Sequence, residues 1–384
     1  MVNVAVIGTG YIGPVHIEAL RRISGIVVKG VTDANRELAR KTAEKYNIEK
    51  VYKDWREILD DPSIHVVHTC APNSLHFPMN KAAIERGKHI LSEKPLAMKV
   101  SEARELTELA EKKGIVTGIN FCYRYYPVVL EMALRVRRGD AGNVRLVTGT
   151  WFQDWLSAAT DWTWRLLRSE SGESNISADL GSHWFDLIQF ATGLRVTEVM
   201  ADFATLVPVR RKPARQVLAF EKAGEAEAQE VKVELEDYSA ILFRLSNGAP
   251  GSFTTSQVAI GRKSDTEFQV YGSKYSCAWN HKRSNELWIG HRDSPNETLI
   301  ESPVLQDPVS AAYASLPTGH PLGYHDAMLN LMKDFYDAVK VVAAGGKEPE
   351  RVLPRPTFRT GYDEMRILEA VVESNRKRAW AKVG

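Results

Sequence analysis

Five short apolar runs alternate with longer segments of helical periodicity in the first 120 residues. The apolar runs predict strands and are VNVAVIG (2–8), IVVKGVTD (26–33), HVVHTCAP (65–72), KHILSE (88–93) and GIVTGIN (114–120). The segments between them predict helices over residues 14–23, 36–46, 75–86 and 102–113. Strands that are apolar on both faces and separated by one helix each indicate a parallel sheet covered by helices. This part of the chain is therefore predicted to be an α/β domain.

The pattern changes after residue 120. Helices are predicted over 127–138 and 177–191, with a strand over NVRLVTGTWFQ between them. From Val196 onward strands dominate, and Asn247-Gly248 predicts a hairpin. Further strands are expected near 266–272, 275–280 and 286–290, and two helices near 324–343 and 358–376. Consecutive strands joined by tight turns indicate an antiparallel sheet, and the polar segment 208–230 is interpreted as a solvated excursion between strands.

Composition narrows the class of protein. Lys plus Arg number 50 and Asp plus Glu 48, a net charge of +2. This balance argues against nucleic acid or an anionic membrane as the main partner, because both need a concentrated basic face. Cys70, Cys122 and Cys277 offer neither a disulfide framework nor a paired metal motif. With no run of about 20 apolar residues and no secretory leader, the sequence predicts a cytoplasmic multi-domain enzyme.

A glycine motif follows the first predicted strand. Gly8-Thr9-Gly10-Tyr11-Ile12-Gly13 is GxGxxG, whose glycines permit a tight turn, close approach of a pyrophosphate, and close packing of helix and strand. Asp33 ends the next strand, where a carboxylate binds the adenosine ribose and repels the 2′-phosphate of NADP. The pattern predicts NAD, with Arg36 leaving NADP as a lesser alternative. The cofactor-binding residues expected here are Gly8, Gly10, Tyr11, Ile12, Gly13, Asp33 and Arg36.

Two later strands end in polar residues at the same expected edge of the sheet. Cys70 is interpreted as a small residue beside the cofactor, since no base for a nucleophilic thiol is apparent. His65, His68, His76 and His89 lack a coherent ligand spacing, so no metal site is predicted. Glu93-Lys94 is either a surface ion pair or a lysine that exchanges a proton with a hydroxyl. The cofactor-binding residues expected at this edge are Cys70, Ala71, Pro72, Asn73, His76, Glu93 and Lys94.

Asp179 and His183 lie four residues apart in DLGSHWFD. On a helix they share one face, about 6 Å apart at Cβ, which suits an acid–base pair or a clamp on sugar hydroxyls. The alternative is a hydrogen-bonded core histidine, and Asp186 is a candidate partner for it.

Four tryptophans, Trp151, Trp155, Trp162 and Trp164, precede that motif. Aromatic faces pack against sugar rings but also form cores. The nearby charges, including Arg165, favour a polar, ring-shaped ligand. Tyr324 and His325 are interpreted either as pocket residues or as helix caps.

Five motifs together, AVIGTGYIG, APNSLH, KHILSEKPLAM, NFCYRYYP and DLGSHWFDL, resemble those of the Gfo/Idh/MocA family of nicotinamide-dependent oxidoreductases. The resemblance implies a Rossmann domain (1–122) and an α+β domain (123–384) with a large, mostly antiparallel open sheet, through which members assemble as dimers or tetramers. The C-terminal helices could pack back on the first domain. By the resemblance, Lys94 and His183 would touch the reacting hydroxyl beside Asp179, and Asn120 and Arg124 would line the nicotinamide end. SGESNISAD departs from the glycine-rich run of many members.

The predicted function is NAD-dependent oxidation of a secondary hydroxyl of a sugar, cyclitol or sugar derivative, or the reverse reduction. Lys94 and His183 would share removal of the hydroxyl proton. The expected substrate-binding residues are Lys94, Arg124, Trp155, Trp162, Arg165, Asp179, His183, Tyr324 and His325. An alternative is an NAD-dependent glycoside-cleaving enzyme that works through a transient keto-sugar.

Overall fold

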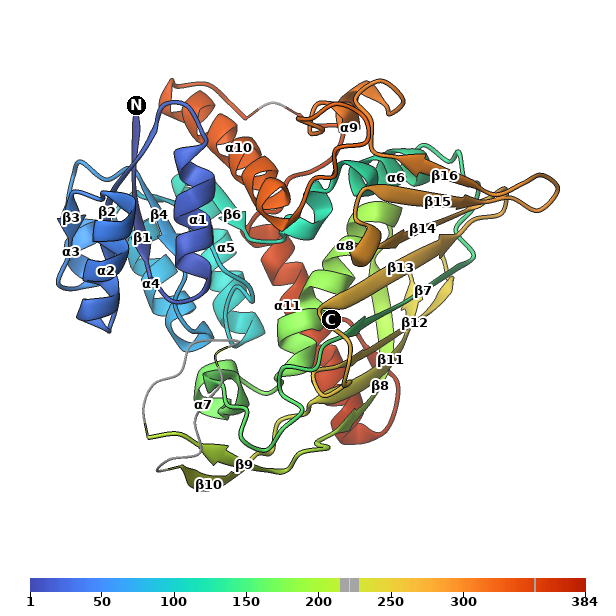
Figure 1. The fold of residues 1–384 in the computed structure, drawn as a ribbon, viewed down its shortest axis with the longest axis horizontal. Coiled ribbons are helices and arrows are strands. Elements are labelled where there is room, and N and C mark those ends of the chain that lie inside the picture. The colour runs from blue at the N-terminus through green and yellow to red at the C-terminus, as the bar shows by residue number, and fades with distance from the viewer. Residues whose placement is uncertain (215–220, 222–227, 349) are drawn as a thin grey trace. The chain divides into compact units, whose positions relative to one another are not determined.

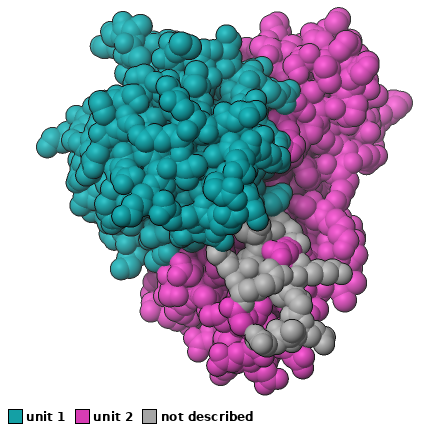
Figure 2. Space-filling model, turned by 60° about the vertical axis from the view of Figure 1, so that its left-hand side comes forward, with its two compact units in different colours: residues 1–122, 328–351, 355–365 teal, residues 123–327, 352–354, 366–384 magenta. Residues whose placement is uncertain are grey.

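The computed structural model describes residues 1–384 except 215–220, 222–227 and 349. The chain forms two compact units, distinguished by colour in Figure 2. Unit 1 comprises residues 1–122, 328–351 and 355–365, and unit 2 comprises residues 123–327, 352–354 and 366–384. Unit 1 is therefore built from the start of the chain together with two segments near its end.

Unit 1 contains a six-stranded parallel sheet in the order β3-β2-β1-β4-β5-β6 (Figure 1). The strands are β1 (Val2–Ile7), β2 (Ile26–Thr32), β3 (Lys50–Val51), β4 (Val66–Thr69), β5 (His89–Ser92) and β6 (Thr117–Ile119). Val4, Ala5 and Val6 in β1 are fully buried, as expected for a central strand covered on both faces. The strand order reverses between β1 and β4, and ligands of such sheets bind at the carboxyl edge there. Strand β3 was not predicted because it is two residues long.

Capping residues mark some of the ends of the helices that accompany this sheet. They are α1 (Ile12–Arg21), α2 (Arg36–Tyr46), α3 (Trp55–Asp60), α4 (Asn73–Glu85) and α5 (Val100–Lys113). The side chain of Asn35 accepts a hydrogen bond from the Leu38 N–H at the start of α2. Gly114, at φ +65°, ends α5 in the left-handed conformation that glycine adopts without strain. The six-residue helix α3 was not expected, although Asp54 caps it.

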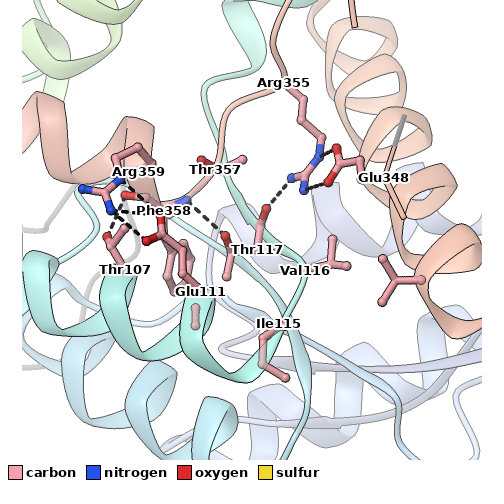
Figure 3. A pocket seen from close by; sticks show the side chains of 13 residues that line it. Thr107, Glu111, Ile115, Val116, Thr117, Glu348, Arg355, Thr357, Phe358 and Arg359 are labelled. Atoms are coloured by element: carbon pink, nitrogen blue, oxygen red, sulfur yellow. Dashed lines mark hydrogen bonds and ion pairs between the residues drawn. The ribbon is translucent and has the colours of Figure 1, made fainter. Parts of the chain in front are cut away.

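The C-terminal segments of unit 1 are attached by two arginines around a cavity of about 250 Å³ (Figure 3). Arg355 pairs with Glu348 and donates to the Thr117 carbonyl, and Arg359 pairs with Glu111 at 2.8 Å. The cavity lies at the start of β6, which is the amino edge of the parallel sheet. Because these charges neutralise one another, we interpret the arrangement as an attachment of the C-terminal segment.

Unit 2 contains a nine-stranded sheet in the order β16-β15-β14-β13-β7-β12-β11-β8-β17. Its strands are β7 (Leu146–Phe152), β8 (Val196–Ala204), β11 (Tyr238–Leu245), β12 (Pro250–Ser256), β13 (Asp265–Tyr271), β14 (Ser276–Asn280), β15 (Glu286–Gly290), β16 (Glu297–Ile300) and β17 (Ala381–Lys382). Neighbouring strands are antiparallel except for the parallel pair β7 and β12. The predicted hairpin at Asn247-Gly248 joins β11 to β12.

Helices pack on one face of this sheet, and an aromatic cluster fills the contact. The helices of unit 2 include α6 (Pro127–Arg137), α7 (Arg168–Ser171), α8 (Ser182–Thr192) and α9 (Pro308–Ala311). Trp184 in α8 stacks on Phe253 in β12, with ring centroids 4.3 Å apart. A Cβ at Gly149 would lie 2.8 Å from the indole of Trp184, so glycine is what permits this approach. Along β7 and β13 buried and partly exposed residues alternate, so the second face is partly exposed in the part of the chain that the structure describes.

The last two long helices are α10 (Tyr324–Ala343) and α11 (Phe358–Lys377). Residues 328–343 of α10 belong to unit 1, and α11 contributes its first eight residues, 358–365, to unit 1 and the rest to unit 2. The polar segment 208–230 begins and ends in a two-stranded hairpin of β9 (Val209–Lys212) and β10 (Gln229–Lys232). Most of the predicted excursion, 215–220 and 222–227, lies outside the described residues. Among the helices described, none is long and apolar enough to cross a membrane.

Candidate active site

The GxGxxG turn connects β1 to α1 with the geometry of a phosphate cradle. A Cβ at Gly8, where φ is +97°, would lie 2.4 Å from the Cys70 carbonyl oxygen, and one at Gly13 would lie 2.1 Å from the Gly8 carbonyl oxygen. In contrast, a Cβ at Gly10 would meet no atom within 4 Å, so open space faces the middle of the turn. The first residues of α1 supply backbone N–H donors beside that space. The turn therefore fits a dinucleotide pyrophosphate.

Asp33 holds this turn as well as ending β2. Its Oδ2 accepts hydrogen bonds from the Thr9 N–H at 2.6 Å and the Thr9 hydroxyl at 3.1 Å, and its Oδ1 accepts from the Asn35 N–H at 2.8 Å. The side chain is half-buried, whereas Tyr11 and Arg36 are exposed. The carboxylate thus has a structural role in the turn, which is compatible with the predicted role as ribose ligand.

The ends of β4 and α4 form the second part of this edge. Ala71 and Pro72 are half-buried, and Asn73 begins α4 as a buried residue. The ring of His76 spans two segments, because Nδ1 lies 2.7 Å from the Pro95 carbonyl oxygen and Nε2 lies 2.8 Å from that of Ala71. Burial lowers the pKa of His76 and raises that of the Cys70 thiol well above its ordinary value. Cys70 is therefore an inert thiol, in agreement with its interpretation as a small packing residue.

Glu93 and Lys94 follow β5 at the same edge. Glu93 is 8% exposed, and its Oε1 receives hydrogen bonds from His16 Nε2 at 2.9 Å and from Asn120 Nδ2. Burial alone would raise the pKa of Glu93, but the hydrogen bonds from His16 and Asn120, together with the coulombic interactions with His16 and Lys94, outweigh it and lower the pKa to about 2. Lys94 is half-buried beside this fixed anion. Both predicted residues thus lie at the carboxyl edge, together with Asn120.

In unit 2, Asp179 lies in a widened helical turn that the sequence pattern did not predict. The predicted helix 177–191 is divided into a π-helical turn, Ser177–Gly181, and α8. Such turns accommodate one extra residue and are frequent at functional sites. Gln257 Nε2 donates to Asp179 Oδ2 at 3.1 Å, and Arg165 Nε lies 3.4 Å from Oδ1. The spacing of four residues therefore does not place Asp179 and His183 on a regular helix.

The segment before this turn, SGESNISAD, stands where many family members have a glycine-rich run. Here its polar groups are hydrogen-bonded to a buried carboxylate. Buried Glu236 accepts hydrogen bonds from the Ser174 hydroxyl and from the N–H groups of Asn175 and Ser177, the last two at 3.1 Å. Burial raises the pKa of Glu236 despite these donors. Asn175 Nδ2 also donates to Gln257 Oε1 at 3.0 Å, and Gln257 in turn holds Asp179. Glu236 and Gln257 were not predicted from the sequence, since neither lies in a recognisable motif.

His183 lies among aromatic rings. Its ring centroid is 5.1 Å from that of Tyr123 and 5.8 Å from that of Trp151, and Tyr123 also contacts Tyr324. His183 is buried, Tyr324 is half-buried and His325 is exposed. Tyr123 was not among the predicted site residues.

The two tryptophans expected to bind substrate, Trp155 and Trp162, differ in burial. Trp162 is 7% exposed and packs with Leu156, Leu166 and Val233, so the structure places it in a hydrophobic cluster. Trp155 is half-buried and donates to Gln153 Oε1 at 2.8 Å. Arg165 lies over the Trp164 ring, 4.5 Å from its centroid, and reaches Asp179. Arg165 and Trp155 therefore retain more accessible surface for a ligand than Trp162.

Two family models match the chain. Residues 2–121 match the oxidoreductase family GFO_IDH_MocA with its NAD-binding Rossmann fold, and residues 129–278 match the GFO/IDH/MocA C-terminal domain. The chain belongs to this family. The predictions of the family, the fold class and an NAD-dependent oxidoreductase are thereby confirmed.

Several relatives of this family member have assigned activities. Levoglucosan dehydrogenase of Pseudarthrobacter phenanthrenivorans is 30% identical over 395 aligned positions, covering 99% of this chain and 98% of the relative. Myo-inositol 2-dehydrogenase of Thermotoga maritima is 26% identical, covering 71% and 73%. The solved structure of levoglucosan dehydrogenase with NADH and levoglucosan superposes with a TM-score of 0.87 at 30% identity, covering 100% of this chain and 99% of that one.

Arg124, expected at the nicotinamide end of this oxidoreductase, has a structural partner in unit 2. Its guanidinium forms a bidentate ion pair with Asp186, with Nε 2.6 Å from Oδ2, and Nη1 donates to the Pro354 carbonyl at 3.1 Å. The Arg124 and Asp186 side chains are 6% and 1% exposed. Asp186 was a candidate partner of His183 in the sequence, and in the structure its carboxylate pairs with Arg124. No local pattern indicates this pairing, since 62 residues separate the two.

Proposed function

We propose that the protein oxidises a secondary hydroxyl of a sugar, cyclitol or sugar derivative with NAD, or reduces the corresponding ketone. The observation that carries this proposal is the position of Lys94. It follows β5 at the carboxyl edge of the sheet, where the GxGxxG turn fits a dinucleotide, and it stands beside a buried carboxylate. When bound, NAD accepts the hydride from the carbinol carbon.

The protein residues supply position and a proton acceptor. We propose that Lys94 and His183 share removal of the hydroxyl proton and that Asp179 orients the substrate. Gln257 and Arg165 engage both oxygens of Asp179, which favours its carboxylate as a hydrogen-bond acceptor for sugar hydroxyls. Tyr123 and Trp151 border His183 with apolar ring surface. This combination suits a ring with C–H faces and several hydroxyls.

The names of the relatives narrow the substrates to test first. Levoglucosan and myo-inositol are cyclic compounds that carry several secondary hydroxyls, and both are substrates by the names of relatives of this chain. We propose a substrate of this class. The three cysteines are buried thiols that form no disulfide in the described part of the chain, which supports the further proposal that the enzyme works in the reducing cytoplasm.

The decisive measurement is the stoichiometry of NADH with a panel of levoglucosan, myo-inositol and D-xylose. We expect one NADH for each product molecule, because in a dehydrogenase the substrate passes its hydride to NAD, and the NADH formed then leaves the enzyme. A glycoside-cleaving enzyme would return the hydride in each cycle. Cleavage of a nitrophenyl glycoside with catalytic NAD and no net NADH would contradict the proposal.

The native protein is expected to prefer NAD to NADP, because the Asp33 carboxylate repels a 2′-phosphate. Asp33→Ser should weaken NAD binding and reduce the preference at least tenfold, about 1.4 kcal/mol. Titration of both cofactors measures this. Asp33→Asn removes the negative charge but keeps an oxygen that can accept hydrogen bonds from Thr9. It therefore distinguishes the effect of the charge on cofactor preference from the effect of the turn structure. Asp54→Asn, which alters the helix-capping carboxylate of α3, is the control and should leave the preference unchanged. A tenfold native preference for NADP would refute the prediction.

We also propose a homodimer or homotetramer assembled through the open face of the nine-stranded sheet. The register places Leu242, Ser252, Thr148, Gln269, Ala278 and Trp288 in one row across six strands. The row carries no charge, and Leu242 is 52% exposed in the single chain. An uncharged row that spans six strands supports self-association. Sedimentation velocity tests the proposal, and a monomer at micromolar concentration would contradict it.

A further inference from the structure

Four buried side chains of unit 1 form a continuous hydrogen-bonded chain that ends on Glu93. Tyr336 Oη lies 2.7 Å from His68 Nε2, His68 Nδ1 lies 2.8 Å from His16 Nδ1, and His16 Nε2 lies 2.9 Å from Glu93 Oε1. Tyr336, His68 and His16 are fully buried. They come from α10, β4 and α1, so the chain crosses the unit from its C-terminal segment to the end of β5. We call these four residues the Glu93 chain.

The surroundings of the Glu93 chain exclude water. Phe335 packs edge-on against His68, and the Tyr336 and His68 rings are stacked with centroids 5.9 Å apart. Burial lowers the pKa of His68 well below its ordinary value and raises that of Tyr336 well above. His68 is therefore neutral and Tyr336 keeps its proton. Each must satisfy its ring nitrogens or hydroxyl within the chain, because an unmade buried hydrogen bond is costly.

The positions of the protons follow from these contacts. Among the described residues, His68 is the partner found for the Tyr336 hydroxyl, so that hydroxyl donates to His68 Nε2. A neutral His68 then carries its proton on Nδ1 and donates to His16 Nδ1. His16, accepting at Nδ1, carries its proton on Nε2 and donates to the ionised Glu93. Every bond in the Glu93 chain thus points toward the carboxylate.

We propose that Tyr336 is a positioning residue for Glu93: its hydroxyl proton fixes the tautomers of both histidines, so that His16 reaches the carboxylate as a neutral donor and leaves the negative charge beside Lys94 intact. A doubly protonated His16 would instead neutralise Glu93 and would require His68 to donate back to Tyr336. The hydroxyl proton would then lose its acceptor. The other groups facing Glu93 are Lys94, which follows β5, Asn120, which follows β6, Cys70, which follows β4, and His76 in α4.

The proton arrangement can be measured on the cofactor-free protein. Histidine labelled with ¹⁵N reports its tautomer through the chemical shifts of both ring nitrogens, and His16→Gln and His68→Gln variants assign the signals. We expect His68 to carry its proton on Nδ1 and His16 on Nε2 at neutral pH. A doubly protonated His16, or His68 protonated on Nε2, would overturn the proposal without reference to any variant's stability.

Tyr336→Phe removes the hydroxyl and keeps the ring. We expect a measurable fraction of His68 to shift to the Nε2–H tautomer, with His16 doubly protonated in that fraction, because no hydroxyl donates to His68 Nε2 any longer. The unpaired Nε2–H limits the size of this fraction. Tyr52→Phe is the matched control, since the Tyr52 hydroxyl is another buried donor of unit 1, 2.7 Å from Asp61 Oδ2, outside the Glu93 chain. It should leave both histidine signals unchanged. Unchanged signals in Tyr336→Phe would refute the positioning role.

The effect on activity rests on the proposed function. An added positive charge at His16 favours the deprotonated form of a nearby base, so the acid limb of the kcat/KM profile of Tyr336→Phe should move to lower pH. NAD affinity should change by less than threefold, and the profile of Tyr52→Phe should match the native one. An unshifted acid limb in a Tyr336→Phe protein with altered tautomers would refute the link to catalysis. Absence of activity on every sugar would refute the proposed function while the NMR result stands.

Discussion

Lys94→Ala is expected to lower kcat by roughly 10²–10⁴-fold, which is the usual contribution of a general acid–base group. The side chain stands at the carboxyl edge beside the fixed anion of Glu93, where it can accept the proton of a substrate hydroxyl. NAD affinity should change by less than threefold, because the GxGxxG turn holds the pyrophosphate independently of this side chain. Steady-state kinetics with the best sugar and titration of NAD by fluorescence measure the two effects separately.

Lys88 provides a matched control at the opposite end of the same strand. It immediately precedes β5, and its buried ammonium donates to the carbonyls of Asp61 and Ile64, both at 2.8 Å. Lys88→Ala should retain kcat and lose stability by roughly 1.5–3 kcal/mol, as expected for hydrogen bonds of a charged group. If Lys94→Ala binds NAD and keeps the native kcat, Lys94 is only a structural ion-pair partner of Glu93.

Asp186→Ala should destabilise unit 2 by about 3–5 kcal/mol, because it leaves the Arg124 guanidinium buried without its carboxylate. The two side chains are almost completely enclosed, so water cannot replace the lost partner. Urea unfolding followed by tryptophan fluorescence measures the change. The double variant Arg124→Met/Asp186→Leu should recover most of the loss, since an apolar pair carries no cost of burying charge.

An exposed ion pair gives the comparison for that experiment. Arg262 and Asp265 pair at 2.5 Å, with the arginine side chain 62% exposed and the aspartate side chain 14% exposed, so solvent reaches the pair from the arginine side. Asp265→Ala at this pair should cost less than about 1 kcal/mol, because solvent screens the interaction. Equal effects at the two pairs would show that burial does not govern the contribution of Asp186.

The sequence was sufficient to predict the first domain in some detail. A buried strand, the GxGxxG turn, a helix and Asp33 are close together in the chain, so local periodicity and spacing describe them. The same holds for the strand ending at Glu93-Lys94. Local patterns were less informative about the tryptophans. Trp155 and Trp162 each directly follow an aspartate, but Trp155 is half-buried and Trp162 is buried. Which one packs into a cluster depends on residues such as Val233, far along the chain.

The contacts that were missed join residues distant in sequence or depend on an irregular backbone. His68 and Tyr336 are 268 residues apart, and no periodicity relates them. His68 was considered for metal binding and rejected on spacing, but its hydrogen bonds to His16 and Tyr336 were not foreseen. The π-helical turn at Asp179 was not predicted, because residues 176–188 are buried except for Asp179, so no alternation of apolar and polar positions marks the change of helical phase. Tertiary structure is needed to find both.

The discontinuity of unit 1 has a consequence for synthesis of the chain on the ribosome. Residues 1–122 emerge first, but Tyr336, Glu348 and Arg355, which complete this unit, are made more than 200 residues later. The nascent dinucleotide-binding part therefore waits, with the ends of β4 and β6 lacking their final partners, until all of unit 2's sheet up to β16 has been translated. Gene fragments designed to transplant this unit into another protein must accordingly encode 328–365 as well as 1–122.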